Sequence, residues 1–197
     1  MTFCRSLVLV AGAVLPLTLS ARAAQNTPTS WLDRPLASWN SAGATVPSPP
    51  SGDETIASIV SRCKLTPPRS TPAERAVDGA GWIPFWNVDQ QLIREDIEIV
   101  GGMRAADSRC LPATYNLFVF VGGRFAGVLS PTSMTSSRDG SSGVVRLPLP
   151  AVTAEFACFA TTDALCCPTS RVTVRYRIDR TPAGPVVVPV DVKTTRR

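Results

Sequence analysis

The sequence of 197 residues contains no histidine. Histidine is the usual general base of Ser-His-Asp and Cys-His enzymes and the commonest zinc ligand, so its absence excludes both kinds of catalysis and most zinc sites. No spacing of acidic residues and cysteines resembles a metal site either. We therefore expect neither a metal nor a cofactor. An enzyme built on this chain would have to use carboxylates, tyrosine, lysine or cysteine.

The sequence also lacks an apolar run long enough to cross a membrane, which takes about 20 residues. Its longest apolar stretch, residues 7–19, follows Arg5 and precedes the small-x-small pattern of residues 21–23, as in a secretory signal peptide. We therefore expect residues 1–23 to be a signal peptide and the rest to be periplasmic or secreted. A lipid anchor would need a cysteine directly after the apolar stretch, but Cys4 precedes it, so we expect neither a membrane span nor a lipid anchor.

A concentrated basic region is missing as well. The chain has 20 basic and 15 acidic residues, and removal of Arg5 and Arg22 with the signal peptide leaves 18 basic residues and a net charge of +3. Only residues 193–197 gather basic side chains, and we expect them to form a solvated tail. A nucleic-acid partner would need a focused basic face, so none is expected.

Residues 24–50 are rich in proline, serine and threonine and predict an extended arm. The arm contains Trp31 and Trp39, which are large apolar side chains for a free tether. We expect them to dock on the domain that follows. The alternative is that they are exposed anchors for a partner protein.

Residues 51–192 predict one α+β domain, with two short N-terminal helices and a twisted antiparallel sheet of six to eight strands. The first helix is expected at residues 51–64, where apolar residues share one face. The second is expected at residues 71–79, because Thr71 and Glu74 have the spacing of a capping box.

The central element of the sheet is expected at residues 115–131. Two apolar runs flank Gly122-Gly123, and this pattern predicts a hairpin because its tight turn requires positive φ angles. Alternation places Leu117, Val119 and Val121 on one face and Phe118 and Phe120 on the other. Because both faces are apolar, we expect this strand to be covered on both sides.

The cleanest alternation of the chain lies at residues 171–179, where apolar residues alternate with polar ones. The polar face carries Arg171, Arg175 and Arg177. Such a face is either solvated or a binding surface for an anionic envelope polymer.

Five cysteines remain after residue 23: Cys63, Cys110, Cys158, Cys166 and Cys167. Export favours oxidation, and a ring between neighbours Cys166 and Cys167 would be strained. We therefore expect Cys63 and Cys110 each to pair with one member of the adjacent couple, in either of two arrangements. Cys158, in an apolar strand, is expected to stay unpaired.

These residues resemble a known family. Residues 163–169, Asp-Ala-Leu-Cys-Cys-Pro-Thr, with the strand that follows, are similar to the Cys-Cys-Pro region of the LppP/LprE family of bacterial envelope lipoproteins. Residues 118–127, Phe-Val-Phe-Val-Gly-Gly-Arg-Phe-Ala-Gly, are similar to the hairpin that precedes it there. The resemblance covers roughly residues 82–191 and implies an envelope location and a disulfide-stapled, β-rich domain.

Two functions remain open. The first is a non-enzymatic binding or structural module whose partner is an unknown envelope component or protein. The second is a hydrolase that uses two carboxylates on an envelope polymer, because paired carboxyl groups at a set separation cleave glycosidic bonds. The acids available for such a pair are Glu95, Asp96, Glu98, Asp107 and Glu155.

The signal peptide gives a direct prediction. We expect cleavage after Ala23, because residues 21–23 form the small-x-small site behind the apolar stretch. N-terminal sequencing of the exported protein checks this. Recovery of the uncleaved chain from the cytosol would contradict it.

Overall fold

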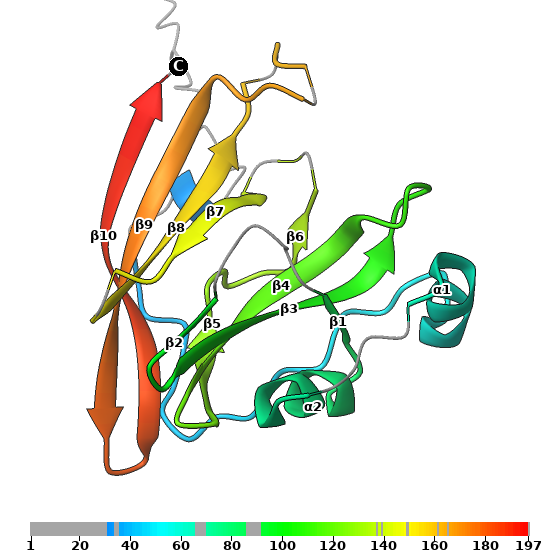
Figure 1. Ribbon diagram of the computed structural model, residues 1–197. Coiled ribbons are helices and arrows are strands. Elements are labelled where there is room, and N and C mark those ends of the chain that lie inside the picture. Colours follow the sequence, from blue (N-terminus) through cyan, green and yellow to red (C-terminus); the bar gives the residue numbers. More distant parts are fainter. Residues whose placement is uncertain are drawn as a thin grey trace, which may run out of the picture.

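The computed structural model describes residues 31–33, 36–65, 70–85, 92–136, 138, 140–148, 150–160, 162–164 and 166–196. The signal peptide predicted at residues 1–23 and the start of the arm lie outside them. Two antiparallel sheets and two α-helices form three layers, with the helices on the outer side of one sheet and the second sheet on its other side (Figure 1). The predicted α+β, β-rich class is thus confirmed.

The helical elements are η1 (Trp31–Asp33), α1 (Ile56–Cys63) and α2 (Pro72–Gly79). The strands are β1 (Ile83–Phe85), β2 (Ile93–Arg94), β3 (Ile97–Ala106), β4 (Pro112–Val121), β5 (Arg124–Val128), β6 (Met134–Thr135), β7 (Ser142–Arg146), β8 (Ala151–Cys158), β9 (Ser170–Thr181) and β10 (Gly184–Arg196). Sheet A has the order β1-β3-β4-β5, with β2 paired to β3 and β6 paired to β4. Sheet B has the order β10-β9-β8-β7.

Strand β4 is the centre of sheet A, as predicted. Gly122 and Gly123 have φ angles of 56° and 72° and form the turn to β5. Leu117, Val119 and Val121 pack in the cluster between the two sheets. Phe118 and Phe120 pack in the second cluster, with α2. Both faces of the strand are therefore covered.

Our expectation of a single sheet is wrong, because the strands form two sheets. The cut falls between β6 and β7, and no strand of sheet B pairs with sheet A among the described residues. The inner face of sheet B, including Phe156, Val174 and Tyr176, packs on the inner face of sheet A. Alternation predicts which face of a strand is buried, but it does not predict whether the covering layer is a helix or another sheet.

The two helices differ in how well their boundaries were predicted. Helix α2 has the predicted capping box: the Thr71 hydroxyl accepts from the Glu74 amide, and the Glu74 carboxylate accepts from the Thr71 amide. Helix α1 starts later than expected, because Thr55, rather than an earlier residue, caps it by accepting from the Ser58 amide. Residues 51–55, which were expected to form its first turn, lie outside the helix.

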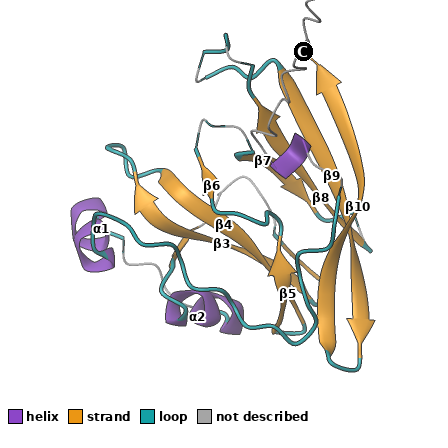
Figure 2. Cartoon of the chain, turned by 180° about the vertical axis from the view of Figure 1, so that it is seen from behind, coloured by secondary structure: helices purple, strands orange, loops and turns teal. Residues whose placement is uncertain are grey.

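The arm lies across the edges of both sheets (Figure 2). The Trp31 ring is edge-on to Phe156 at 4.9 Å and to Trp39 at 5.4 Å, and Trp39 is edge-on to Tyr176 at 6.3 Å. The Trp39 indole also donates to the Val128 carbonyl at 2.9 Å. The expectation that the tryptophans dock is confirmed.

Asn40 joins the arm to both sheets at once. Its side-chain amide donates to the Val128 carbonyl of β5 at 3.0 Å and to the Val187 carbonyl of β10 at 2.9 Å. Its side-chain oxygen accepts from the Val128 amide at 2.9 Å. Gly127 has a φ of +136° and makes room for this side chain, because a Cβ there would lie 2.3 Å from the Asn40 Cγ.

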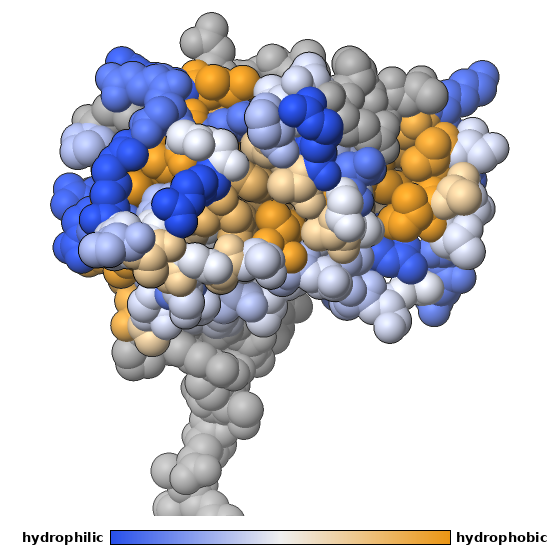
Figure 3. Space-filling model, turned by 90° about the horizontal axis from the view of Figure 1, so that it is seen from below, coloured by the Kyte–Doolittle hydropathy of each residue, from blue (hydrophilic) through white to orange (hydrophobic). Residues whose placement is uncertain are grey.

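The lower end of the molecule brings three turns together. Arg180 of β9 forms an ion pair with Asp96, in the β2–β3 turn, at 2.8 Å. Arg124 at the start of β5 donates to the Ala183 carbonyl in the β9–β10 turn at 2.9 Å. Seen from below, apolar surface here is interrupted by charged side chains (Figure 3). These contacts tie the turns of sheet A to those of sheet B.

The cysteine pairing that we expected is wrong. Cys63 pairs with Cys110, with their Cα atoms 5.5 Å apart, and Cys166 pairs with Cys167. Cys158 belongs to neither of these two disulfides, as predicted. The reason is spatial: α1 and the β3–β4 turn meet at one side of the molecule, whereas the β8–β9 connection lies at its upper end (Figure 1).

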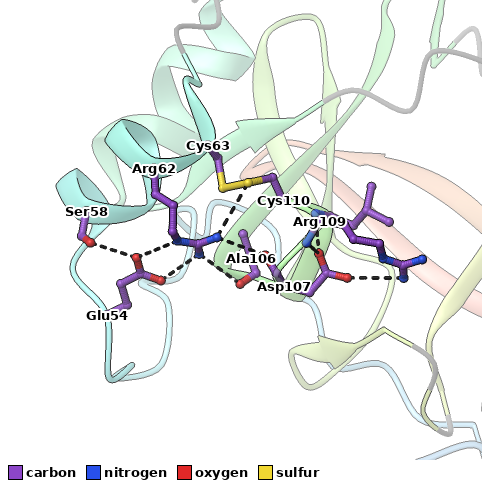
Figure 4. The surroundings of a disulfide bond; sticks show 9 residues. Glu54, Ser58, Arg62, Cys63, Ala106, Asp107, Arg109 and Cys110 are labelled. Carbon is purple, nitrogen blue, oxygen red and sulfur yellow. Dashed lines mark hydrogen bonds and ion pairs between the residues drawn. A yellow bond between two sulfur atoms is a disulfide. The ribbon is translucent and has the colours of Figure 1, made fainter.

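Arg62 makes several hydrogen bonds next to the Cys63–Cys110 bond (Figure 4). Its guanidinium binds the Glu54 carboxylate at 3.0 and 3.2 Å and donates to the Ala106 and Asp107 carbonyls. It also lies 3.7 Å from the Cys110 sulfur. The hydrogen bond from Arg62 is the main cause of the lowered pKa of Glu54. Helix α1 is therefore held to the β3–β4 turn by both covalent and polar contacts.

We predict that Asn40→Ala lowers the free energy of unfolding by about 2–4 kcal/mol, because the amide of Val128 and the carbonyl of Val187 lose a partner in a part-buried site. Urea unfolding of the mature protein measures it. Ser38→Ala is the matched control, because Ser38 makes only an exposed hydrogen bond to the Asn40 carbonyl. Equal midpoints for the two variants would contradict the role of Asn40.

We also predict that Cys63→Ser/Cys110→Ser lowers the free energy of unfolding by about 4 kcal/mol. The bond closes a loop with a sequence separation of 47, which restricts the unfolded chain. Urea unfolding without reductant measures the change, and Cys158→Ala serves as a control that removes a cysteine outside both disulfides. A double variant as stable as the unmodified protein would show that this bond does not stabilise the fold.

Candidate functional site

A basic face covers the outer side of sheet B. It consists of Arg146 on β7, Arg171, Arg175 and Arg177 on β9, and Lys193 on β10. The strand register sets four neighbours in one row, in the order Asp191, Arg175, Thr153 and Arg146. The row crosses all four strands of the sheet, so each side chain comes from a different strand.

The arginines of this face differ in whether an acid binds them. Arg171 forms an ion pair with Glu155 at 3.7 Å, and Arg177 forms one with Asp179 on its own strand. The hydrogen bond from Arg177 is the main cause of the lowered pKa of Asp179.

The other two arginines of the face, Arg146 and Arg175, are exposed. Neither has an ion pair or a side-chain hydrogen bond with a residue that the structure describes. Asp191 is opposite Arg175 in the register, but the two are not within ion-pair distance. Two guanidinium groups on either side of the Thr153 hydroxyl are thus available to an outside anion.

Sequence reasoning found the β9 arginines but missed Arg146 and Lys193. The alternation of β9 was visible in one segment, whereas the other two side chains join the face only through the register of β7 and β10. A bulge in β7 between Ser142 and Val145 also hides its alternation. Strand pairing was the missing information.

The acids considered for hydrolysis do not come together. Asp96 and Asp107 lie at opposite ends of β3, and Glu155 lies on the outer face of sheet B. Asp96 is bound by Arg180, and Asp107 accepts from the Arg109 and Leu111 amides. These contacts are the main causes of the lowered pKa of both Asp96 and Asp107, so both carboxyl groups are ionised and occupied.

One pair of acids does meet at Thr71. The Thr71 hydroxyl donates to Glu98 at 2.6 Å, and the Thr71 amide donates to Glu74 at 2.9 Å. Glu74 is fully buried, and its second carboxylate oxygen has no hydrogen-bond partner. A substrate cannot reach a carboxylate with no exposed surface, so this pair is a helix cap rather than a catalytic dyad.

A hollow of about 410 Å³ lies at the lower end of the molecule. It is lined by residues 44–46 of the arm, the last turn of α2, the β4–β5 turn and the rings of Phe120 and Phe125. Its lining is apolar and contains no titratable side chain. It offers contact area but no catalytic group.

Trp31 and Trp39, considered as anchors for a partner, contact aromatic rings of the protein itself. Both are partly buried against the main apolar cluster, so a partner-binding role is not supported. Within the described parts of the chain, no three metal-ligating side chains cluster. The helices described there include none long and apolar enough to span a membrane.

Comparison with known proteins gave a match for part of the sequence. A search of curated proteins and a search of solved structures found no match. The family of LppP/LprE lipoproteins matches residues 96–181, which run from the β2–β3 turn to the end of β9. The matched segment contains β4, the four arginines of the basic face and the adjacent cysteines. A lipoprotein family indicates an association with the cell envelope, and it speaks against our expectation that no lipid anchor is involved. Over this segment the chain is similar to LppP/LprE lipoproteins.

Proposed function

We propose that the protein is a non-enzymatic binding module of the cell envelope and that the basic face of sheet B binds an anionic envelope polymer. The observation that supports this most is the pair Arg146 and Arg175, both exposed and both without an acidic partner among the described residues. The family match to lipoproteins supports the envelope as the place of action. Periplasmic and secreted locations are equally compatible with the proposal.

The shape and charge of the face suit a polymer. The outer side of a sheet is broad rather than hollowed, and its four strands repeat the same side-chain spacing, so successive anionic groups of a chain meet successive arginines. The face carries five basic residues against Glu155, Asp179 and Asp191, which gives a local charge of +2. A guanidinium binds carboxylate, sulfate and phosphate groups through two parallel hydrogen bonds, which favours arginine for this task.

The hydrolase alternative receives no comparable support. Every carboxyl group with a shifted pKa in the described residues is shifted downward: Glu54, Asp96, Asp107, Asp163 and Asp179. A general acid needs the opposite shift, so that it holds a proton near neutral pH. These five carboxylates are committed to hydrogen bonds within the protein.

We predict that Arg146→Gln/Arg175→Gln weakens binding of dextran sulfate, a soluble anionic polysaccharide, by about five- to thirtyfold at low salt. The range corresponds to the loss of two exposed charge contacts of roughly 0.5–1 kcal/mol each. Titration calorimetry of the mature protein measures the affinity. The binding of the unmodified protein should also weaken as salt rises, because the contacts are exposed and screened.

The matched control is Lys64→Gln/Arg109→Gln, which removes the same charge from the C-cap of α1 and from the β3–β4 turn, away from sheet B. Binding by this variant should stay within about twofold of the unmodified protein. If both double variants lose affinity equally, net charge rather than the basic face accounts for binding. If neither loses affinity, the proposal is wrong.

A further inference from the structure

The β8–β9 connection holds a disulfide with no apparent stapling role. Cys166 and Cys167 are adjacent, so their bond closes no segment of chain beyond the two residues themselves. A disulfide stabilises a fold mainly by shortening the loops open to the unfolded chain, and the effect grows with loop length. The Cys63–Cys110 bond, with a sequence separation of 47, fits that account, whereas the Cys166–Cys167 bond does not.

The two disulfides also differ in access. Cys166 and Cys167 are both exposed, whereas Cys63 and Cys110 are partly buried. The Arg62 guanidinium also packs against the Cys110 sulfur. Thiol–disulfide exchange requires a thiolate to approach a sulfur atom, so access decides which bond is attacked first.

The loop around Cys166 and Cys167 is held by contacts that do not involve sulfur. One oxygen of the Asp163 carboxylate accepts from the Ala160 amide at 2.8 Å, the Thr169 amide at 2.7 Å and the Thr169 hydroxyl at 3.0 Å. The bond from the Thr169 amide is the main cause of the lowered pKa of Asp163, so the carboxylate keeps its charge. The Cys167 amide donates to the Ala164 carbonyl, and Pro168 is buried. The loop therefore has a framework that can persist when the disulfide opens.

We propose that Cys166–Cys167 is an exchangeable disulfide, a site of covalent capture for thiols outside the fold. A thiolate attacks one of the two sulfurs, a mixed disulfide forms, and the Cys166–Cys167 bond breaks with its electron pair leaving on the other sulfur as a thiolate. That neighbouring thiolate can attack the mixed disulfide, re-form the original bond and expel the incoming thiolate. Alternatively, a second external thiolate attacks the external sulfur of the mixed disulfide. This forms a disulfide between the two external thiols and leaves both cysteines reduced. This site is independent of the basic face.

The experiment titrates the mature Cys158→Ala protein with glutathione in one arm and with dithiothreitol in the other, so that a monothiol and a dithiol are compared. Free thiols are blocked with N-ethylmaleimide at each concentration, and peptides are mapped by mass spectrometry. Cleavage after Arg146 and Arg171 places residues 147–171 in one peptide, and cleavage after Arg109 and Arg124 isolates Cys110. The variant removes Cys158, the third cysteine of the first peptide, so label in that peptide reports Cys166 and Cys167 alone.

We expect Cys166 and Cys167 to be labelled at thiol concentrations at least tenfold lower than those that open Cys63–Cys110. The Cys166→Ser variant of the same protein is treated with oxidised glutathione instead: the Cys167 thiolate attacks that disulfide, one glutathione leaves as a thiolate, and the adduct on Cys167 should accumulate because the resolving neighbour is gone. The double variant Cys166→Ser/Cys167→Ser should keep the urea midpoint of its parent. The proposal is overturned if Cys63–Cys110 opens first, if the adduct fails to form in the single variant, or if the double variant unfolds at a clearly lower midpoint. If dithiothreitol alone opens the Cys166–Cys167 bond, the partners of the site are dithiols. If both reagents open it, the partners are thiols in general.

Discussion

The fold depends on a strand that is apolar on both faces. From Tyr115 to Val121 every residue of β4 is buried, so water must be excluded from both sides of sheet A. A single sheet with one solvated face cannot meet that demand. Helix α2 covers Phe118 and Phe120, and sheet B covers Leu117, Val119 and Val121. The three layers follow from the composition of this one segment.

The arm completes the layering along the edge. Neither sheet is closed on itself, and β5 and β10 would otherwise meet only through side chains. Asn40 supplies backbone-like hydrogen bonds to both strands, and Trp39 binds the same Val128 carbonyl that Asn40 binds. A proline-rich segment that makes no sheet of its own can thus act as part of the framework, because its side chains replace missing strand contacts.

Local signals in the sequence predicted local features well. The capping box at Thr71, the Gly122-Gly123 turn and the alternation of β9 all depend on residues close together in the chain, and each is found where it was expected. Features that depend on pairing between distant segments were not predictable in this way. The division into two sheets, the Cys63–Cys110 bond and the contribution of Arg146 to the basic face each required the register or the position of another element. The cysteine pairing was predicted wrongly for the same reason. Ring strain argued against a bond between adjacent cysteines, but the sequence did not indicate which cysteines lie close together in the fold.

The contacts of Asn40 set an order of events during folding. The asparagine is separated from Val128 by 88 positions and from Val187 by 147, so its two partners become available at very different times as a chain emerges N-terminus first. The β4–β5 hairpin can pair while sheet B is still incomplete, but the arm can close across both sheets only after β10 has been made. Contacts of such long separation form late, because their loop entropy is lost before they are gained. A chain delivered through a membrane pore would therefore keep its N-terminal arm open until translocation was almost finished, and arm closure would mark the end of delivery.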